Sequence, residues 1–186
     1  MPYNFNIKNQ NKGIEMIEVQ KYNPQWSNRF QSLSSQFLPH IKDLTLDVVH
    51  VGGTSIKGMS SHPTIDINIV VDDFSTIQKI SEKLRLVGYY PENNEVQKDQ
   101  FVFKHNKSVA HSLQIVQKDS LNLKMQLLLK KHLEENSTAL NEYDTLKNKF
   151  ASGKISLDKY QAAEKKLIEC YLSAEGMTEE EISQIL

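Results

Sequence analysis

The sequence predicts an α+β fold, in which a mixed β-sheet with flanking helices is followed by a helical C-terminal half. Two observations predict it. Four short stretches rich in β-branched and aromatic residues lie before residue 118, and from about residue 121 apolar residues recur at helical spacing to the end of the chain. Because strands and helices segregate along the chain, an α+β arrangement is favoured over a doubly wound parallel sheet.

The N-terminal half also contains two predicted helices. Residues 25–38 carry apolar side chains at helical spacing, from Trp26 to Phe37. Pro39 is expected to end this helix, because proline lacks the backbone N–H and clashes with the preceding turn. The second helix is predicted over residues 74–86.

The strand pattern is clearest where isoleucines alternate with polar residues. In that stretch Asp66 and Asn68 fall on one face and the isoleucines on the other, because successive strand side chains point to opposite faces. The predicted strands cover residues 44–51, 64–71, 100–105 and 111–117.

The C-terminal half reads as a series of helices with recognisable caps. Ser137 and Ser156 are expected to cap the second and third of them, and Thr178 with Glu181 forms a capping box for the last. These helices are predicted over residues 121–134, 138–151, 156–172 and 178–185.

The domain organisation predicted from composition is simple. Residues 1–15 are polar and Asn-rich, which is typical of a flexible tail. We expect residues 16–186 to form one domain, with a sheet-containing part to about residue 118 and a helical part from about residue 120.

Charge and composition narrow the class of function. The 22 Lys and Arg residues against 23 Asp and Glu residues leave a formal charge of −1, so binding to duplex nucleic acid is not expected. The single cysteine, Cys170, excludes an intramolecular disulfide and a Cys-rich zinc site. With no apolar run of about 18 residues, we expect no membrane association and a cytoplasmic protein.

The most informative motif is the run Gly52-Gly53-Thr54-Ser55, which follows a strand and is followed by Asp66 on the next strand. Glycines let a backbone approach a triphosphate closely, and free amides and hydroxyls donate hydrogen bonds to its oxygens. A carboxylate on the adjacent strand is the kind of ligand that Mg²⁺ prefers. The alternative is a tight structural turn in which Asp66 is a capping or salt-bridge residue.

Further stretches match a known sequence pattern. They are Tyr22-Asn23-Pro24-Gln25-Trp26, the run from His50 to Met59, the run from His62 to Ile67, the run from Leu129 to Leu133, and the run from Tyr143 to Lys147. Together they resemble the GrpB-like family of the nucleotidyltransferase superfamily, over about residues 17–172. This resemblance implies a nucleotidyltransferase-like fold that binds a nucleoside triphosphate with Mg²⁺.

The resemblance also implies roles for individual residues. The implied catalytic residues are Asp66 and His50, with Asp66 and Asn68 as metal ligands. The implied nucleotide- or phosphate-binding residues are Gly52, Gly53, Thr54, Ser55 and Lys130, with His111 and Lys147 as possible additions.

The chain departs from a working nucleotidyltransferase at its second carboxylate. Asn68 stands there, and its carbonyl oxygen coordinates a metal without adding negative charge. A third acid is absent, and of the family's later histidine pattern only His111 remains. Gly53 replaces the family's serine, which changes the donor set around a phosphate.

The four remaining candidates each have a structural alternative. His50 and His111 lie on predicted strands and would converge near Asp66 if those strands are neighbours, yet a strand histidine is often only a buried, hydrogen-bonded residue. Lys130 and Lys147 lie on predicted helices, from which they either reach a triphosphate or form ordinary surface pairs.

Three hypotheses for function follow. The first is an enzyme that transfers a nucleotidyl group to an unknown acceptor. The second is a catalytically degenerate module that binds a nucleotide or phosphate. The third is an accessory module whose helical half docks a partner. The first two share a site and differ in turnover.

Overall fold

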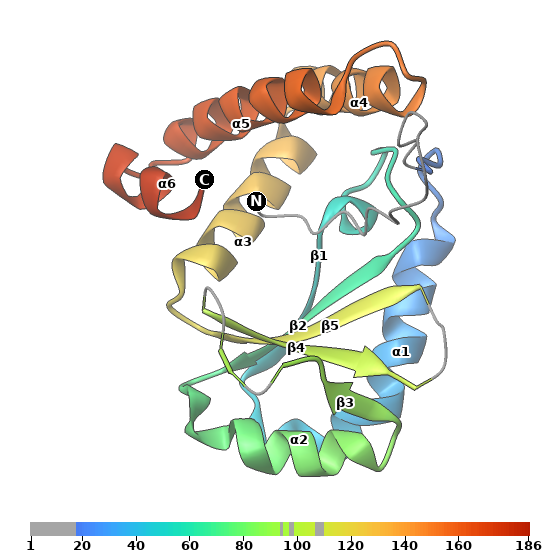
Figure 1. The fold of residues 1–186 in the computed structure, drawn as a ribbon, viewed down its shortest axis with the longest axis vertical. Helices are drawn as coiled ribbons and strands as arrows, with labels where there is room; N and C mark the ends of the chain where they lie inside the picture. Colours follow the sequence, from blue (N-terminus) through green and yellow to red (C-terminus); the bar gives the residue numbers. More distant parts are fainter. Residues whose placement is uncertain (1–17, 94, 97–98, 107–109) are drawn as a thin grey trace.

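The computed structural model describes residues 18–93, 95–96, 99–106 and 110–186, so the predicted tail at residues 1–15 lies outside them. A five-stranded sheet occupies the centre of this described part, with helices on both of its faces (Figure 1). The strands are β1 (Asp47–Val51), β2 (Ile65–Val71), β3 (Tyr89–Pro91), β4 (Gln100–His105) and β5 (His111–Gln117). The helices are α1 (Gln25–Ile41), α2 (Ile77–Arg85), α3 (Leu121–Glu135), α4 (Ser137–Ala151), α5 (Leu157–Ala174) and α6 (Glu179–Ile185).

The sheet is mixed, as the sequence predicts. Its strand order is β1-β2-β5-β4-β3, in which β2 and β5 run parallel and the other neighbours run antiparallel. The register pairs Asp66 with Val51 on one side and with Ser112 on the other, and it pairs Asn68 with Gln114. Candidate polar residues of β2 and β5 therefore lie side by side.

One face of the sheet is covered by α1 and α2. Its alternate β2 residues Ile65, Ile67 and Ile69 are at most 1% exposed and pack with Trp26 and Phe37 of α1. Burial of this apolar stripe supplies the main driving force for closing this layer.

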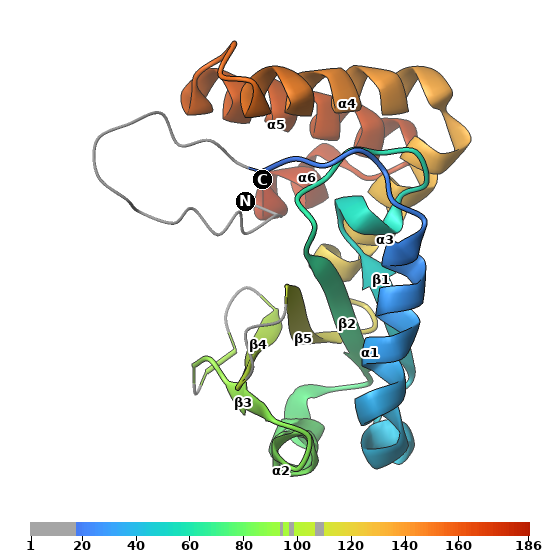
Figure 2. The ribbon, with the colours of Figure 1, turned by 90° about the vertical axis from the view of Figure 1, so that its right-hand side faces the viewer.

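The opposite face is covered by α3, which leads into the layer of α4 and α5 (Figures 1 and 2). Leu123 of α3 packs on Val70 and Val116. A second apolar cluster joins α3 to α4, α5 and α6, and it includes Ile56 and Met59 from the segment between β1 and β2. That segment rises from the sheet to the underside of α4 (Figure 2), so it ties the Gly-Gly turn to the helical layer.

Two local predictions differ from the structure, and one short strand was not predicted. Helix α1 runs through Pro39, because Ile41, with Phe37 one turn before it, is fully buried and continues the same apolar stripe. Asn136 rather than Ser137 caps α4, accepting a hydrogen bond from the amide of Ala139. Strand β3, with three residues, is too short to give a periodic signal.

The caps at Ser156 and at Thr178 with Glu181 are confirmed. Within the described part of the chain, no helix is long and apolar enough to cross a membrane.

Candidate functional site

The Gly-Gly turn is packed directly against Asp66. Gly52 adopts a φ of +75°, which only glycine adopts readily, and a Cβ placed on it would lie 2.2 Å from Oδ2 of Asp66. The following residues, Gly53–Ser55, form a single 3₁₀ turn. The backbone of Gly52 and the carboxyl group of Asp66 therefore lie closer together than any side chain at residue 52 would permit.

Lys147 of α4 lies on the other side of the same turn. A Cβ at Gly53 would lie 2.4 Å from the Ser61 hydroxyl and 3.0 Å from Nζ of Lys147. The lysine is buried, with its ammonium group 4.6 Å from the centroid of the Tyr143 ring and 3.6 Å from Sδ of Met59. The structure thus brings Gly52, Gly53, Asp66 and Lys147 together.

Carboxylates surround Lys147 from the helical side. Glu164 accepts hydrogen bonds from the hydroxyls of Tyr143 and Tyr160, and Asp144 accepts one from the amide of Ser60 at 2.6 Å. Burial lowers the pKa of Lys147, and the charges of Glu164, Asp144 and Asp66 oppose that effect. Burial raises the pKa of Asp66 to about 7, with Lys147 opposing it.

Asn68 is held in a row of side-chain amides. Its carbonyl oxygen accepts a hydrogen bond from Gln114 at 2.6 Å, and its NH₂ group donates one to Gln126 of α3, also at 2.6 Å. Asn68 is completely buried. Both ends of this amide are therefore occupied by protein groups.

These contacts do not fit the predicted magnesium site. Asp66 is the one carboxylate of the β2 and β5 polar positions, because Asn68 and Gln114 are amides bonded to each other. Across the described residues, no group of three or more His, Cys, Asp or Glu side chains is arranged to hold a metal ion. Mg²⁺ takes several oxygen ligands, and these strand positions offer it a single carboxylate.

Thr54 and Ser55 use their hydroxyls inside the protein. The Thr54 hydroxyl donates to the carbonyl oxygen of Thr64 at 3.0 Å, and the Ser55 hydroxyl donates to that of Gly52 at 2.7 Å. The predicted donation of both hydroxyl protons to phosphate oxygens would therefore require these internal hydrogen bonds to break.

Comparison with known proteins decides the family. A profile described as GrpB protein matches residues 16–174. The chain belongs to the GrpB family. A relative of this GrpB family member is the UPF0157 protein YqkA of Bacillus subtilis, with 25% identity over 141 residues, or 73% of this chain. The chain spans 40% of the length of YqkA.

One solved structure shows the same architecture. The GrpB protein of Enterococcus faecalis matches with a TM-score of 0.72 and 24% identity, over 86% of this chain and 100% of that one. The likeness to the Cid1 poly(U) polymerase has a TM-score of 0.46 and 13% identity, over 67% of this chain and 40% of that one.

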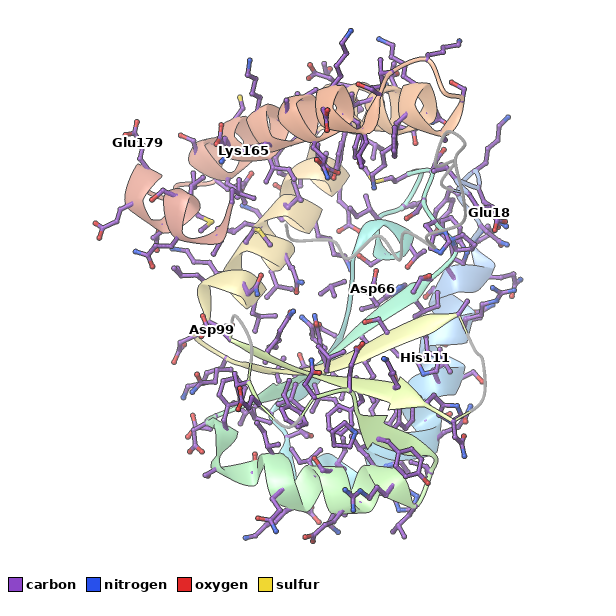
Figure 3. All side chains as sticks on the ribbon, viewed as in Figure 1. Glu18, Asp66, Asp99, His111, Lys165 and Glu179 are labelled. Atoms are coloured by element: carbon purple, nitrogen blue, oxygen red, sulfur yellow. The ribbon has the colours of Figure 1, made fainter. Side chains whose placement is uncertain are left out.

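The expected convergence of His50 and His111 on Asp66 is wrong in this GrpB chain. Their strands do neighbour β2, but His50 pairs with Ile67 and His111 pairs with Ile65. Residues paired across strands share a face, so both imidazoles lie on the isoleucine side of the sheet and Asp66 lies on the other. Figure 3 labels Asp66 on β2 and His111 at the start of β5.

His50 is instead part of the α1 side. Its ring stacks on Phe30 with 4.9 Å between centroids, and its Nε2 lies 3.0 Å from the Thr54 hydroxyl. Burial, followed by the charge of Lys130, lowers the pKa of His50 to about 4. Lys130 reaches the carbonyl oxygen of His50 at 3.4 Å and lies with His50, not beside Lys147.

Four residues around the site escaped the sequence analysis. Gln114 and Gln126 complete the amide row, and Ser61 and Glu164 lie near Lys147 and the turn. Asp144 precedes Lys147 by three residues, a spacing that predicts an ordinary surface pair, but the structure places it beside the buried lysine. The alternation of β5 was a usable signal for the face of Gln114.

Proposed function

We propose that this GrpB family member is a nucleotide-binding module that binds the phosphates between the Gly52-Gly53 turn and Lys147. In this proposal it does not carry out metal-dependent nucleotidyl transfer. The observation that carries the proposal is the difference between two residues on the polar face of β2. Asp66 and Lys147 lie together at the turn, while both ends of the Asn68 amide are hydrogen-bonded to Gln114 and Gln126.

The turn and its surroundings offer a phosphate two kinds of partner, which are backbone amide groups and a positive charge. The first amides of a helical turn have no partner within it, and they point outward from its start. The three atoms nearest to a Cβ placed on Gly53 belong to the side chains of Ser61 and Lys147. An arriving phosphate therefore displaces side chains rather than backbone, and it gains the ammonium group of Lys147 as a partner.

Asp66 contributes as a proton donor. Burial raises the pKa of its carboxyl group to about 7, so the protonated form is available near neutral pH. In the protonated form it donates a hydrogen bond to a phosphate oxygen and adds no repulsion. Phosphate binding at this site therefore favours uptake of a proton by Asp66.

Resemblance to nucleotidyltransferases keeps transfer as the competing hypothesis, and the two respond oppositely to pH. A metal-dependent enzyme needs the ionised carboxylate, so its triphosphate binding strengthens as pH rises. The binding module needs the protonated carboxyl group, so its binding weakens as pH rises. Calorimetric titration with ATP, GTP, CTP and UTP at pH 6 and pH 8, with and without Mg²⁺, separates them.

We expect tighter binding at pH 6, little dependence on Mg²⁺ and no release of pyrophosphate. Asp66→Asn is the matched variant, because it keeps the shape and a donor while removing the titration; it should retain binding and lose the part of the pH dependence that exceeds the nucleotide's own titration. Lys147→Met should weaken binding. Mg²⁺-dependent pyrophosphate release that disappears in Asp66→Ala would establish transfer instead, and failure of all four nucleotides would remove both hypotheses.

A further inference from the structure

A groove lies at the outer edge of β1, away from the place where the Gly52-Gly53 turn packs against Asp66. Its volume is about 460 Å³, which is within the range of small-molecule sites. Helix α1 forms one wall and α3 the other, with β1 and the end of the 3₁₀ turn between them. Strand β1 is the edge strand of the described sheet, and among the described residues no further strand covers this side.

The charge of the groove has one sign. Lys130 of α3 is its single Lys or Arg residue, and the described residues that line it include no Asp or Glu. Among the described residues, the ammonium group of Lys130 makes a long hydrogen bond of 3.4 Å to the carbonyl oxygen of His50, and an ammonium group has three donors. The groove therefore favours a ligand with an anionic group near Lys130.

Hydrogen bonds define the protonation of the His50 ring. The Thr54 hydroxyl has a single proton, which it donates to the carbonyl oxygen of Thr64. It must therefore accept from Nε2 of His50, which carries the ring proton. Because the pKa of His50 is lowered to about 4, the ring is neutral at neutral pH, and Nδ1 is left as an acceptor.

The remaining walls combine apolar and aromatic residues with polar ones, which are Ser27 and Gln31 of α1 and Thr54 and Ser55 of the 3₁₀ turn. Tyr22 and Phe30 lie on the α1 side, Val48 on β1, and Leu127 on α3, where it is 41% exposed. Flat rings bury large areas against such walls with little loss of conformational freedom.

We propose that this groove binds a small anion with a flat ring, whose acidic group pairs with Lys130 and whose ring carries an N–H or O–H donor for His50. This assignment does not depend on nucleotide binding at the Asp66 face. It also gives Lys130 a role separate from that of Lys147.

The anionic group has two chemical sources, a carboxylate and a phosphate monoester, and two probes distinguish them. 4-Hydroxybenzoate offers a ring, a carboxylate and an O–H donor, and 4-methoxybenzoate is its matched control without the donor. Adenosine 5′-monophosphate offers a ring, a phosphate and an N–H donor, and adenosine is its uncharged control. Binding is measured by calorimetric titration of the full chain at millimolar ligand.

We expect at least one charged probe to bind and its control to bind about tenfold more weakly, which corresponds to the loss of one charge-assisted or hydrogen-bonding contact. Lys130→Gln should also weaken binding about tenfold, while Lys131→Gln should not, since Lys131 lies next to it on α3 but pairs with Glu175. Leu127→Glu adds a carboxylate at an exposed groove position and should abolish binding without disturbing the core.

Unchanged affinity in both Lys130→Gln and Leu127→Glu would place the probe elsewhere and overturn the assignment. Absence of binding by both charged probes would overturn it as well. Asp66→Ala provides the distinction from the nucleotide site: probe binding should survive it, whereas loss of probe binding in that variant would mean that the ligand occupies the Asp66 face.

Discussion

The side chains on the two faces of β2 have the same spacing along the strand but are held in place in different ways. On the α1 side, Ile65, Ile67 and Ile69 share one apolar cluster in which any one residue touches many equivalent neighbours. On the α3 side, Asp66 and Asn68 each depend on particular partners: Lys147 and Gly52 for the first, Gln114 and Gln126 for the second. Packing by volume tolerates exchange, whereas hydrogen bonding leaves specific groups unpaired when one partner is lost.

The largest effect is expected where the polar face meets the turn. Gly52→Val introduces a β-branched residue at a φ of +75° and a Cβ 2.2 Å from Oδ2 of Asp66. Strain and displacement together should lower the free energy of unfolding by about 4 kcal/mol. Urea denaturation measures it.

Gly153→Val is the matched control for Gly52→Val. Its φ is +70°, but nothing lies within 4 Å of the added Cβ, so it reports the backbone strain alone, about 1–2 kcal/mol. Equal losses in the two variants would show that the close approach of Asp66 to Gly52 contributes nothing to stability.

The amide row gives the next largest effect. Asn68→Leu should cost about 2–3 kcal/mol, because it leaves a donor on Gln114 and an acceptor on Gln126 unpaired in a buried place. Replacing Asn68, Gln114 and Gln126 together by leucine should cost less than the single change, since no amide is then left unpaired. Thermal unfolding of the single and triple variants makes the comparison, and a triple variant less stable than the single one would contradict it.

The difference between the faces also explains how much of the site was predictable. The isoleucine alternation is local, so it correctly predicted β2 and the shared face of Asp66 and Asn68. The mixed sheet and helical half followed from similar local periodicity. The partners of Asn68 lie 46 and 58 residues away, and Lys147 lies 81 residues from Asp66, so no local pattern shows that these residues meet.

The prediction for His50 failed for a related reason. Its strand and its neighbour were predicted correctly, but the face depends on the register between β1 and β2, and a shift of one residue reverses it. The registered pair His50 and Ile67 therefore places the imidazole on the apolar side. Pro39 shows the same limit within a helix, because burial of Ile41 outweighs the local signal to stop.

The raised pKa of Asp66 should make the stability of the protein depend on pH, which the apolar face of β2 does not do. Its folded pKa of about 7 exceeds the usual 3.8, so the folded state holds a proton that the unfolded state releases between about pH 4 and pH 7. Stability should therefore fall as pH rises through that window, at no more than about 1.4 kcal/mol per pH unit. Asp66→Asn should remove this fall. Urea denaturation of both proteins at pH 5, 6, 7 and 8 tests it, and parallel pH curves for the two would refute the raised pKa.

The smallest effect concerns the His50 imidazole, which is hydrogen-bonded to Thr54 on the apolar side of the sheet beside α1. Thr54→Val keeps the shape of residue 54 but removes the acceptor for Nε2 of His50 and the donor to Thr64, which should cost about 1 kcal/mol. Ser55→Ala removes a hydroxyl of the same turn that donates to Gly52 and not to the His50 or Thr64 groups, and it serves as the control. Nitrogen chemical shifts of the His50 ring should report a single Nε2–H tautomer in the unaltered chain and in Ser55→Ala, and a mixture in Thr54→Val. The His50 imidazole, a polar group on the apolar face, would then depend on a particular partner, as Asp66 and Asn68 do on the other face. Dependence on a particular partner is therefore a property of polar side chains and not of the face on which they lie.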